Sequence, residues 1–169
     1  MFDGLQARAR RNLPVRGVKV DIVIVGEPLP FDSESPRLLR SSLLAHELAS
    51  RGAEVRLWTS RFDHFSKQQR TNVGPVESRG GIEYRFLEAP SYSHNISLGR
   101  IRHNIELGRA FRAALSKSPM ADVTVCSMPT IELASESVRH RLMRGGRVFL
   151  DIRDAWPDAL ARLAPSALQ

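Results

Sequence analysis

Short apolar runs alternate with amphipathic segments along most of the chain. The runs are rich in β-branched residues without polar alternation, which is typical of strands buried on both faces of a parallel sheet. The intervening segments carry apolar residues at helical spacing. The strands are predicted over 20–25, 55–59, 82–87, 122–126 and 147–152. The helices are predicted over 36–51, 98–117 and 130–144.

Turn and capping residues support these limits. Ser35 is a suitable N-cap for a helix that begins at Pro36, and Gly52 is a suitable stop after Arg51. In the third predicted helix, apolar residues fall on one face, and Gly145 and Gly146 end the helix. That face comprises Ile131, Ala134, Val138 and Leu142.

The order of elements predicts the fold class. A strand, a helix, a tight turn and a second strand form a βαβ unit, in which the two strands are parallel and the crossover is right-handed. Repetition of this alternation predicts an α/β fold with a doubly wound, mostly parallel sheet. We expect this domain to occupy 18–169, preceded by a basic flexible arm over 1–17. The polar, aperiodic stretch 61–80 is expected to be a long loop.

Composition excludes several classes of protein. No apolar run approaches the ~18 residues that a membrane-spanning helix needs, and the N-terminus does not have the pattern of a secretory signal. The single cysteine, Cys126, permits neither an internal disulfide nor a zinc cluster, and we expect it to be an inert core thiol. A cytoplasmic location is therefore expected.

The net charge of +7 leaves two interpretations open. It suits anionic partners such as polyphosphates, nucleic acids or membrane surfaces, and it equally suits an arginine-rich proteome with scattered cations. Binding of nucleic acid through the basic arm is not expected, because the sequence shows neither a recognition helix nor a set of stacking aromatic residues.

The candidate chemistry lies where the predicted strands end. In open α/β sheets, ligands bind beyond the carboxyl ends of the strands. The loops expected there are 26–35, 59–65, 128–132 and 153–158, and they carry the polar candidates Glu27, Asp32, Asp63, His64, Arg153 and Asp154. Arg153 could clamp a phosphate or carboxylate, and Asp154 could orient Arg153 or accept hydrogen bonds from hydroxyl groups. The alternative is that both residues only cap the next helix.

The first of these loops argues against a dinucleotide or ATP site. Such sites need glycines that allow the backbone to approach phosphates, whereas this loop is acidic and stiffened by prolines. No cofactor and no metal site are expected.

The second predicted helix carries a basic stripe. Arg102, Arg109 and Arg112 lie on one side of the helix, beside an apolar stripe that includes Ile101 and Ile105. This layout suits a helix lying on an anionic bilayer. It also suits a helix packed on the core, with arginine stems along its margin.

Six segments, taken in order, resemble the N-terminal half of GT-B glycosyltransferases, and more narrowly the family-four retaining enzymes of bacterial surface-polysaccharide synthesis. The segments are GEPLPFD (26–32), RLLR (37–40), RGAEV (51–55), WTSRFDHF (58–65), HNISL (94–98) and DIRDAWP (151–157). The last of these, a strand followed by Arg-Asp and Trp-Pro, is the most specific.

This resemblance implies a Rossmann-like, acceptor-side domain facing a cleft, with the nucleotide-sugar donor held by a separate C-terminal domain. It implies a glycan or lipid-linked acceptor and docking on the cytoplasmic face of the membrane through Arg102, Arg109 and Arg112. Arg153 stands where many relatives have a histidine that contacts the donor sugar. Arg153 and Asp154 are therefore the candidate catalytic residues. The substrate-binding candidates are Glu27, Asp32, Arg37, Asp63 and His64.

The sequence shows no donor-binding domain after this region, so we expect the chain to be incomplete and inactive on its own. The alternative hypothesis is a non-catalytic subunit of a split glycosyltransferase, which pairs with a separate donor-binding polypeptide.

Overall fold

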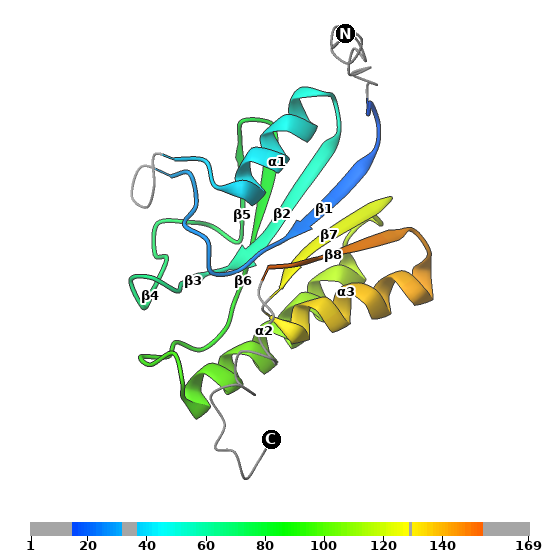
Figure 1. Cartoon of the computed structure of the whole chain (residues 1–169). Helices are drawn as coiled ribbons and strands as arrows, with labels where there is room; N and C mark the ends of the chain where they lie inside the picture. Colours follow the sequence, from blue (N-terminus) through cyan, green and yellow to red (C-terminus); the bar gives the residue numbers. More distant parts are fainter. Residues whose placement is uncertain (1–14, 32–36, 129, 154–169) are drawn as a thin grey trace, which may run out of the picture.

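A six-stranded sheet with helices on both faces forms the centre of the molecule (Figure 1). The computed structural model describes residues 15–31, 37–128 and 130–153. The strands of the sheet are β1 (Lys19–Val23), β2 (Glu54–Ser60), β5 (Val76–Arg79), β6 (Ile82–Leu87), β7 (Val123–Met128) and β8 (Arg147–Ile152). The helices are α1 (Arg40–Ser50), α2 (Leu98–Lys117) and α3 (Ile131–Arg144).

The sheet is doubly wound and mostly parallel, as the sequence predicted. Its strand order is β5-β6-β2-β1-β7-β8, and only β5 runs antiparallel to its neighbour. The chain passes from β1 through α1 to β2 on one side, and through α2 and α3 to β7 and β8 on the other. The molecule is therefore an α/β protein with a Rossmann-like fold, and the parallel strands all end at one edge of the sheet.

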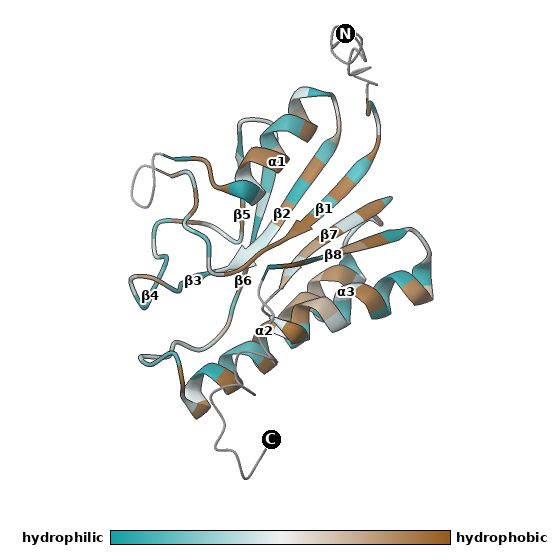
Figure 2. Ribbon diagram, viewed as in Figure 1, coloured by the Kyte–Doolittle hydropathy of each residue, from teal (hydrophilic) through white to brown (hydrophobic). Residues whose placement is uncertain are grey.

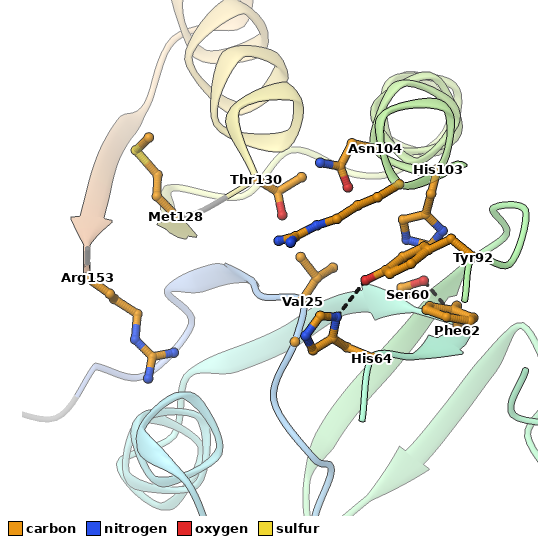
Figure 3. A pocket seen from close by; sticks show the side chains of 12 residues that line it. Val25, Ser60, Phe62, His64, Tyr92, His103, Asn104, Met128, Thr130 and Arg153 are labelled. Carbon is orange, nitrogen blue, oxygen red and sulfur yellow. Dashed lines mark hydrogen bonds between the residues drawn. The ribbon is translucent and has the colours of Figure 1, made fainter. Parts of the chain in front are cut away.

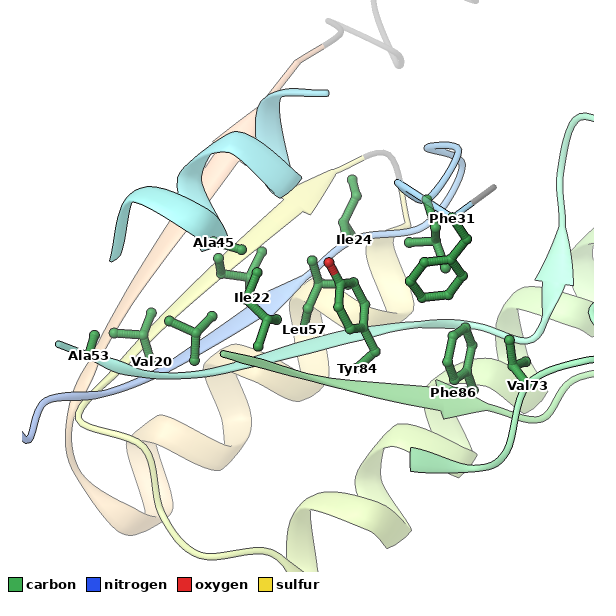
Figure 4. Packing of buried hydrophobic residues seen from close by; sticks show 13 residues of the cluster. Val20, Ile22, Ile24, Phe31, Ala45, Ala53, Leu57, Val73, Tyr84 and Phe86 are labelled. Carbon is green, nitrogen blue, oxygen red and sulfur yellow. The ribbon is translucent and has the colours of Figure 1, made fainter. Parts of the chain in front are cut away.

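Successive side chains of β1 point to opposite faces of the sheet, so the core has two parts. Apolar residues predominate along this central strand (Figure 2). Ile22 and its neighbours on β2 and β6 pack beneath α1, together with Phe31 and Tyr84 (Figure 4). Val23 and Trp58 face the other way and pack against α2 and α3, where Phe111 and Leu107 are fully buried. Both faces of the central strands are thus covered, as their continuous apolar runs require.

The helix limits show where local signals decide the structure. α2 has the predicted limits, because the Ser97 hydroxyl accepts a hydrogen bond from the Arg100 amide and fixes the first turn. α1 begins at Arg40 and not at Pro36, because Leu39 still has an extended backbone. Ser35 and Pro36 themselves lie outside the described residues.

The predicted loop over 61–80 is wrong in part. It contains a two-stranded hairpin of β3 (Phe62–Asp63) and β4 (Gln68–Gln69), and β5 follows it along the edge of the main sheet. Arg61 and Arg70 stabilise the hairpin, since the Arg70 amide donates to the Arg61 carbonyl at 2.8 Å and the Arg61 guanidinium donates to the Arg70 carbonyl at 2.9 Å. These strands are short and mostly exposed, so they leave no apolar period in the sequence.

The buried face of α3 also differs from the prediction. Ala134 is buried as predicted, but Ile131 and Leu142 are exposed, and Leu133, Ser137 and Arg141 are buried instead. The cause is Arg141, whose guanidinium donates to the Thr124 hydroxyl on β7 and approaches the Asp21 carboxylate at 3.6 Å. A buried arginine held by polar partners therefore turns the helix away from the orientation that apolar spacing suggests.

Candidate functional site

A pocket of about 380 Å³ lies beyond the carboxyl ends of β1, β2 and β7 (Figure 3). Its lining combines charged, polar and aromatic side chains from five segments of the chain. The lining residues are Val25, Gly26, Ser60, Phe62, His64, Tyr92, Arg100, His103, Asn104, Met128, Thr130 and Arg153. This is the edge at which doubly wound sheets bind ligands, so the pocket is the candidate site.

Arg153 lines the pocket and is paired with Glu27, which is not itself a lining residue. Arg153 follows β8, Glu27 follows β1, and the Arg153 guanidinium donates to Glu27 Oε1. Glu27 is almost fully buried, and its second oxygen, Oε2, has no hydrogen-bond partner within the described part of the chain. The pair joins segments that are far apart in sequence and fixes the arginine at the rim of the pocket.

His64 lies on the turn after β3 and is held by Tyr92. Its Nδ1 is 2.5 Å from the Tyr92 hydroxyl and 3.4 Å from Lys67 Nζ. Burial, followed by the charges of Lys67 and Arg100, lowers the pKa of His64, while burial raises the pKa of Tyr92. Tyr92 therefore keeps its hydroxyl hydrogen near neutral pH. Because Lys67 Nζ can only donate, Nδ1 of the neutral imidazole accepts, and the ring hydrogen is on Nε2.

His103 reaches the pocket from α2. It is 4% exposed, packs against the Phe62 and Tyr92 rings, and its Nδ1 lies 2.6 Å from the Pro90 carbonyl oxygen. Because the carbonyl can only accept, Nδ1 carries the hydrogen and Nε2 of the neutral ring is an acceptor. Burial lowers the pKa of His103, although the hydrogen bond to Pro90 opposes that shift.

Thr130 brings the amino end of α3 to the pocket. It is the N-cap residue of the helix and is buried, yet its side chain makes no capping hydrogen bond. Its hydroxyl points into the space between the pocket walls (Figure 3). The first-turn amides of α3 are thus left without this usual partner, and the positive end of the helix dipole faces the same space.

The pocket lining offers hydrogen-bond donors and acceptors and positive charge to a ligand. No group of His, Cys, Asp and Glu within the described residues is arranged to hold a metal ion. The one cysteine, Cys126, is fully buried in the core, and burial raises the pKa of its thiol to about 11. Such a thiol stays protonated near neutral pH and is a poor nucleophile.

The structure brings some of the predicted site residues together and separates others. His64 and Arg153 both line the pocket, and Glu27 is hydrogen-bonded to Arg153. Asp63 is next to His64, but its carboxylate accepts hydrogen bonds from the amides of Phe65 and Ser66 at 3.0 and 3.2 Å, so it shapes the turn. Burial alone would raise the pKa of Asp63. The hydrogen bonds and the charge of Arg70 outweigh burial, so the pKa of Asp63 is lowered.

Among the other predicted substrate-binding and catalytic residues, Arg37 is the one that the structure describes. Arg37 is exposed ahead of α1 and does not line the pocket. Asp32 and Asp154 lie outside the described residues.

The three arginines predicted to face a membrane are exposed on α2. Arg109 pairs with Glu106 of the same helix at 2.8 Å, and Arg112 pairs with Glu136 of α3. In the apolar stripe predicted beside them, Ile101 and Ile105 are exposed. The buried side of α2 comprises His103, Leu107, Gly108, Phe111 and Leu115.

Sequence reasoning missed the residues that follow β6. Tyr92, Arg100, His103 and Asn104 all come from the segment after this strand and from the first turns of α2. The sequence did contain a signal for these residues. The run 82–87 is predicted to be a further parallel strand, so the segment that follows it must start at the same edge of the sheet as the other candidate loops.

No protein-family model matches the chain, and no curated protein matches it. As for membranes, none of the helices in the described part of the chain combines the length and hydropathy needed to cross a bilayer.

Proposed function

We propose that this chain is the acceptor-side domain of a glycosyltransferase, which moves a sugar from a nucleotide-sugar to a polysaccharide or lipid-linked acceptor. One observation carries the proposal. At the ligand-binding edge of a Rossmann-like sheet, hydrogen-bonding side chains such as Asn104 and Thr130 line a pocket beside the rings of Phe62 and Tyr92. Sugar hydroxyl groups need such donors and acceptors, and the Phe62 and Tyr92 rings, which pack on each other with centroids 4.6 Å apart, supply the apolar part of the lining.

The motif 151–157 supports the same proposal. It resembles the corresponding element of family-four glycosyltransferases, and its Arg153 lies at the rim of the pocket, hydrogen-bonded to Glu27. In the proposed enzyme, Arg153 contacts the donor sugar or an acceptor hydroxyl. The donor is held by a second domain, in the same polypeptide or in a separate one.

Saturation-transfer NMR tests the sugar-binding proposal. Methyl glycosides of hexoses and N-acetylhexosamines are mixed with the purified chain, and we expect saturation to reach the ring protons of at least one of them. Asn104→Ala should abolish the saturation transfer to the glycoside, because it removes a side-chain amide from the pocket wall. Asn72→Ala is the matched control, since Asn72 is exposed and does not line the pocket. Absence of transfer to every glycoside, or equal transfer with Asn104→Ala, would refute the proposal.

We also propose that the amino end of α2 rests on an anionic membrane surface. Exposed apolar side chains gather there, with Ile96 94%, Leu98 84% and Ile101 56% exposed. Arg102 is exposed on the next turn and adds a positive charge. Apolar side chains beside cations are the combination that holds a peripheral helix at the interface of a bilayer.

Vesicle sedimentation tests this placement. The chain should sediment with vesicles that contain phosphatidylglycerol and remain in solution with vesicles of phosphatidylcholine alone. Replacing Ile96, Leu98 and Ile101 together by Ser should release the protein. Replacing the equally exposed Leu142 and Met143 of α3 by Ser is the control and should change nothing. If the triple variant and the control variant bound the vesicles equally well, the placement would be contradicted.

A further inference from the structure

We infer that the open edge of β8 is an interface at which a second copy of this chain pairs in antiparallel fashion. This strand ends the sheet order β5-β6-β2-β1-β7-β8, and within the described residues its one partner strand is β7 (Figure 1). The pairing joins two six-stranded sheets into one continuous sheet across a two-fold axis. Such a dimer forms or fails independently of any binding of a glycan.

The two edges of the sheet differ in their chemistry. β5, at one edge, has four residues, and Glu77 and Arg79 among them are charged. β8, at the other edge, has six residues, and its apolar side chains are exposed, with Phe149 56%, Leu150 41% and Ile152 66% exposed. Proteins protect sheet edges against pairing with short, charged strands. β5 is protected in this way, whereas the apolar centre of β8 is not.

The backbone of β8 is arranged to accept a second partner strand. The Arg147 amide donates to the Asp122 carbonyl at 3.0 Å, so Arg147 directs its backbone groups toward β7. Adjacent residues of a strand direct these groups to opposite sides. The amides and carbonyls of Val148, Leu150 and Ile152 therefore face the open edge, where another strand can hydrogen-bond to them.

The order of side chains along β8 selects one register. In a two-fold antiparallel pair, facing residues lie on the same side of the joined sheet. If Phe149 faces Phe149 of the second copy, Arg147 faces Asp151 of that copy, and the same ion pair forms again across the axis. Val148 then faces Leu150 of the second copy. Over 147–151, every apolar side chain thus meets an apolar one and every charge meets its opposite.

Other registers lose this match. If Leu150 faced its own copy, Phe149 would face the Asp151 carboxylate and Arg147 would face Arg153. If Val148 faced its own copy, Phe149 would face Arg147. A shift that places a charge against an aromatic ring or against a like charge is unfavourable, so the sequence of β8 specifies a single pairing.

Both charged side chains of β8 are accessible to a second chain. Arg147 is exposed. Asp151 is partly exposed, and its oxygens lie 3.0 Å from Arg40 and 3.5 Å from the Ser127 hydroxyl. A carboxylate can accept about four hydrogen bonds, so Asp151 can also accept from Arg147 of the second copy.

The exposed apolar stripe of α3 lies beside the same edge. α3 packs on β7 and β8, and its Glu136 points toward α2, where it accepts from Arg112. At about 100° per residue, Ile131, Val138 and Leu142 lie on the side of the helix opposite Glu136. Because α2 covers the inner strands, that side of α3 is turned toward the open edge of β8. The stripe therefore lies next to the arriving copy and extends the apolar surface of the interface.

Analytical ultracentrifugation tests the pairing, in salt of about 0.15 M to screen the net charge of +7. We expect a species with twice the 18.9 kDa of one chain to appear as the concentration rises. Arg147→Asp and Asp151→Arg each place two pairs of like charges across the axis, so each should weaken dimerisation at least about tenfold. Arg102→Asp is the matched control, because it makes the same change of charge on the exposed side of α2 and should leave the dimer unchanged.

An equimolar mixture of the two charge variants distinguishes a specific pairing from a general effect of charge. In the mixed dimer of Arg147→Asp with Asp151→Arg, both facing pairs again have opposite charges. The mixture should therefore dimerise about as well as the unsubstituted chain, although each variant alone does not. Thermal unfolding of each variant alone checks that it is folded.

Single cysteines test the register. Phe149→Cys should give a disulfide-linked dimer on mild oxidation, because residues that face their own copy bring their Cβ atoms within disulfide range. Val148→Cys should cross-link far less, because Val148 faces Leu150 of the second copy, and the buried Cys126 should not react. A chain that is monomeric at every concentration, a dimer that neither charge variant weakens, a mixture that stays monomeric, or equal cross-linking by both cysteine variants would each overturn the inference.

Discussion

A single buried carboxylate organises the interior on the side of α2 and α3. Asp21 lies within an otherwise apolar strand and is 1% exposed. It accepts both guanidinium hydrogen bonds of Arg56, at 2.7 and 3.0 Å, and one from the Trp58 indole at 2.9 Å. Arg141 of α3 approaches it at 3.6 Å. The apolar run predicted the strand but not this network, because hydrophobic patterning treats a lone acid as an interruption.

Asp21→Asn should destabilise the fold severely at neutral pH. The substitution leaves two buried guanidinium groups without their counter-charge, and breaking a buried ion pair costs about 3–5 kcal/mol. The measurement is the free energy of unfolding in urea. Glu54→Gln is the control, because Glu54 pairs with Lys19 on the surface, where a salt bridge contributes at most about 1 kcal/mol. A loss no greater for Asp21→Asn than for Glu54→Gln would show that Asp21 is not the centre of this network.

At the scale of elements, the sequence predicted those segments whose local signals agree with their packing. α2 has both its Ser97 cap and a buried apolar stripe that ends at Leu115, and its limits match the prediction. The main strands also match to within two residues at their ends. Agreement is weakest where tertiary contacts decide the structure, as at the exposed hairpin β3–β4 and at the face of α3 that carries Arg141.

The candidate site was predictable only through topology. Glu27, His64 and Arg153 are far apart in sequence, and the carboxyl ends of parallel strands explain why they lie near one another. The roles of Arg100 and His103 could not be read from the sequence. Both lie on the helix that follows the loop after β6, and whether such side chains turn toward the pocket depends on how α2 packs.

At the scale of the whole molecule, buried histidines couple stability to pH. His64, His103 and His140 all have a lowered pKa, in each case mainly because burial disfavours the charged ring. In the unfolded chain these groups titrate near 6.5. As pH falls below that value, the unfolded state takes up protons that the folded state does not, so stability is lost. The lowered pKa values of Asp63 and Glu136 act in the same direction but only at more acidic pH.

We therefore expect the free energy of unfolding in urea to be lower at pH 5.5 than at pH 7.5. This interval spans the unfolded pKa of histidine and lies above that of the carboxylates, so the loss belongs to the histidines. His103→Gln should reduce the size of this loss, even if its stability at pH 7.5 is lower because the hydrogen bond to Pro90 is altered. His94→Gln is the control, because His94 is exposed. Equal stability at the two pH values, or an undiminished loss in His103→Gln, would contradict the assignment of His103 as a buried, neutral imidazole.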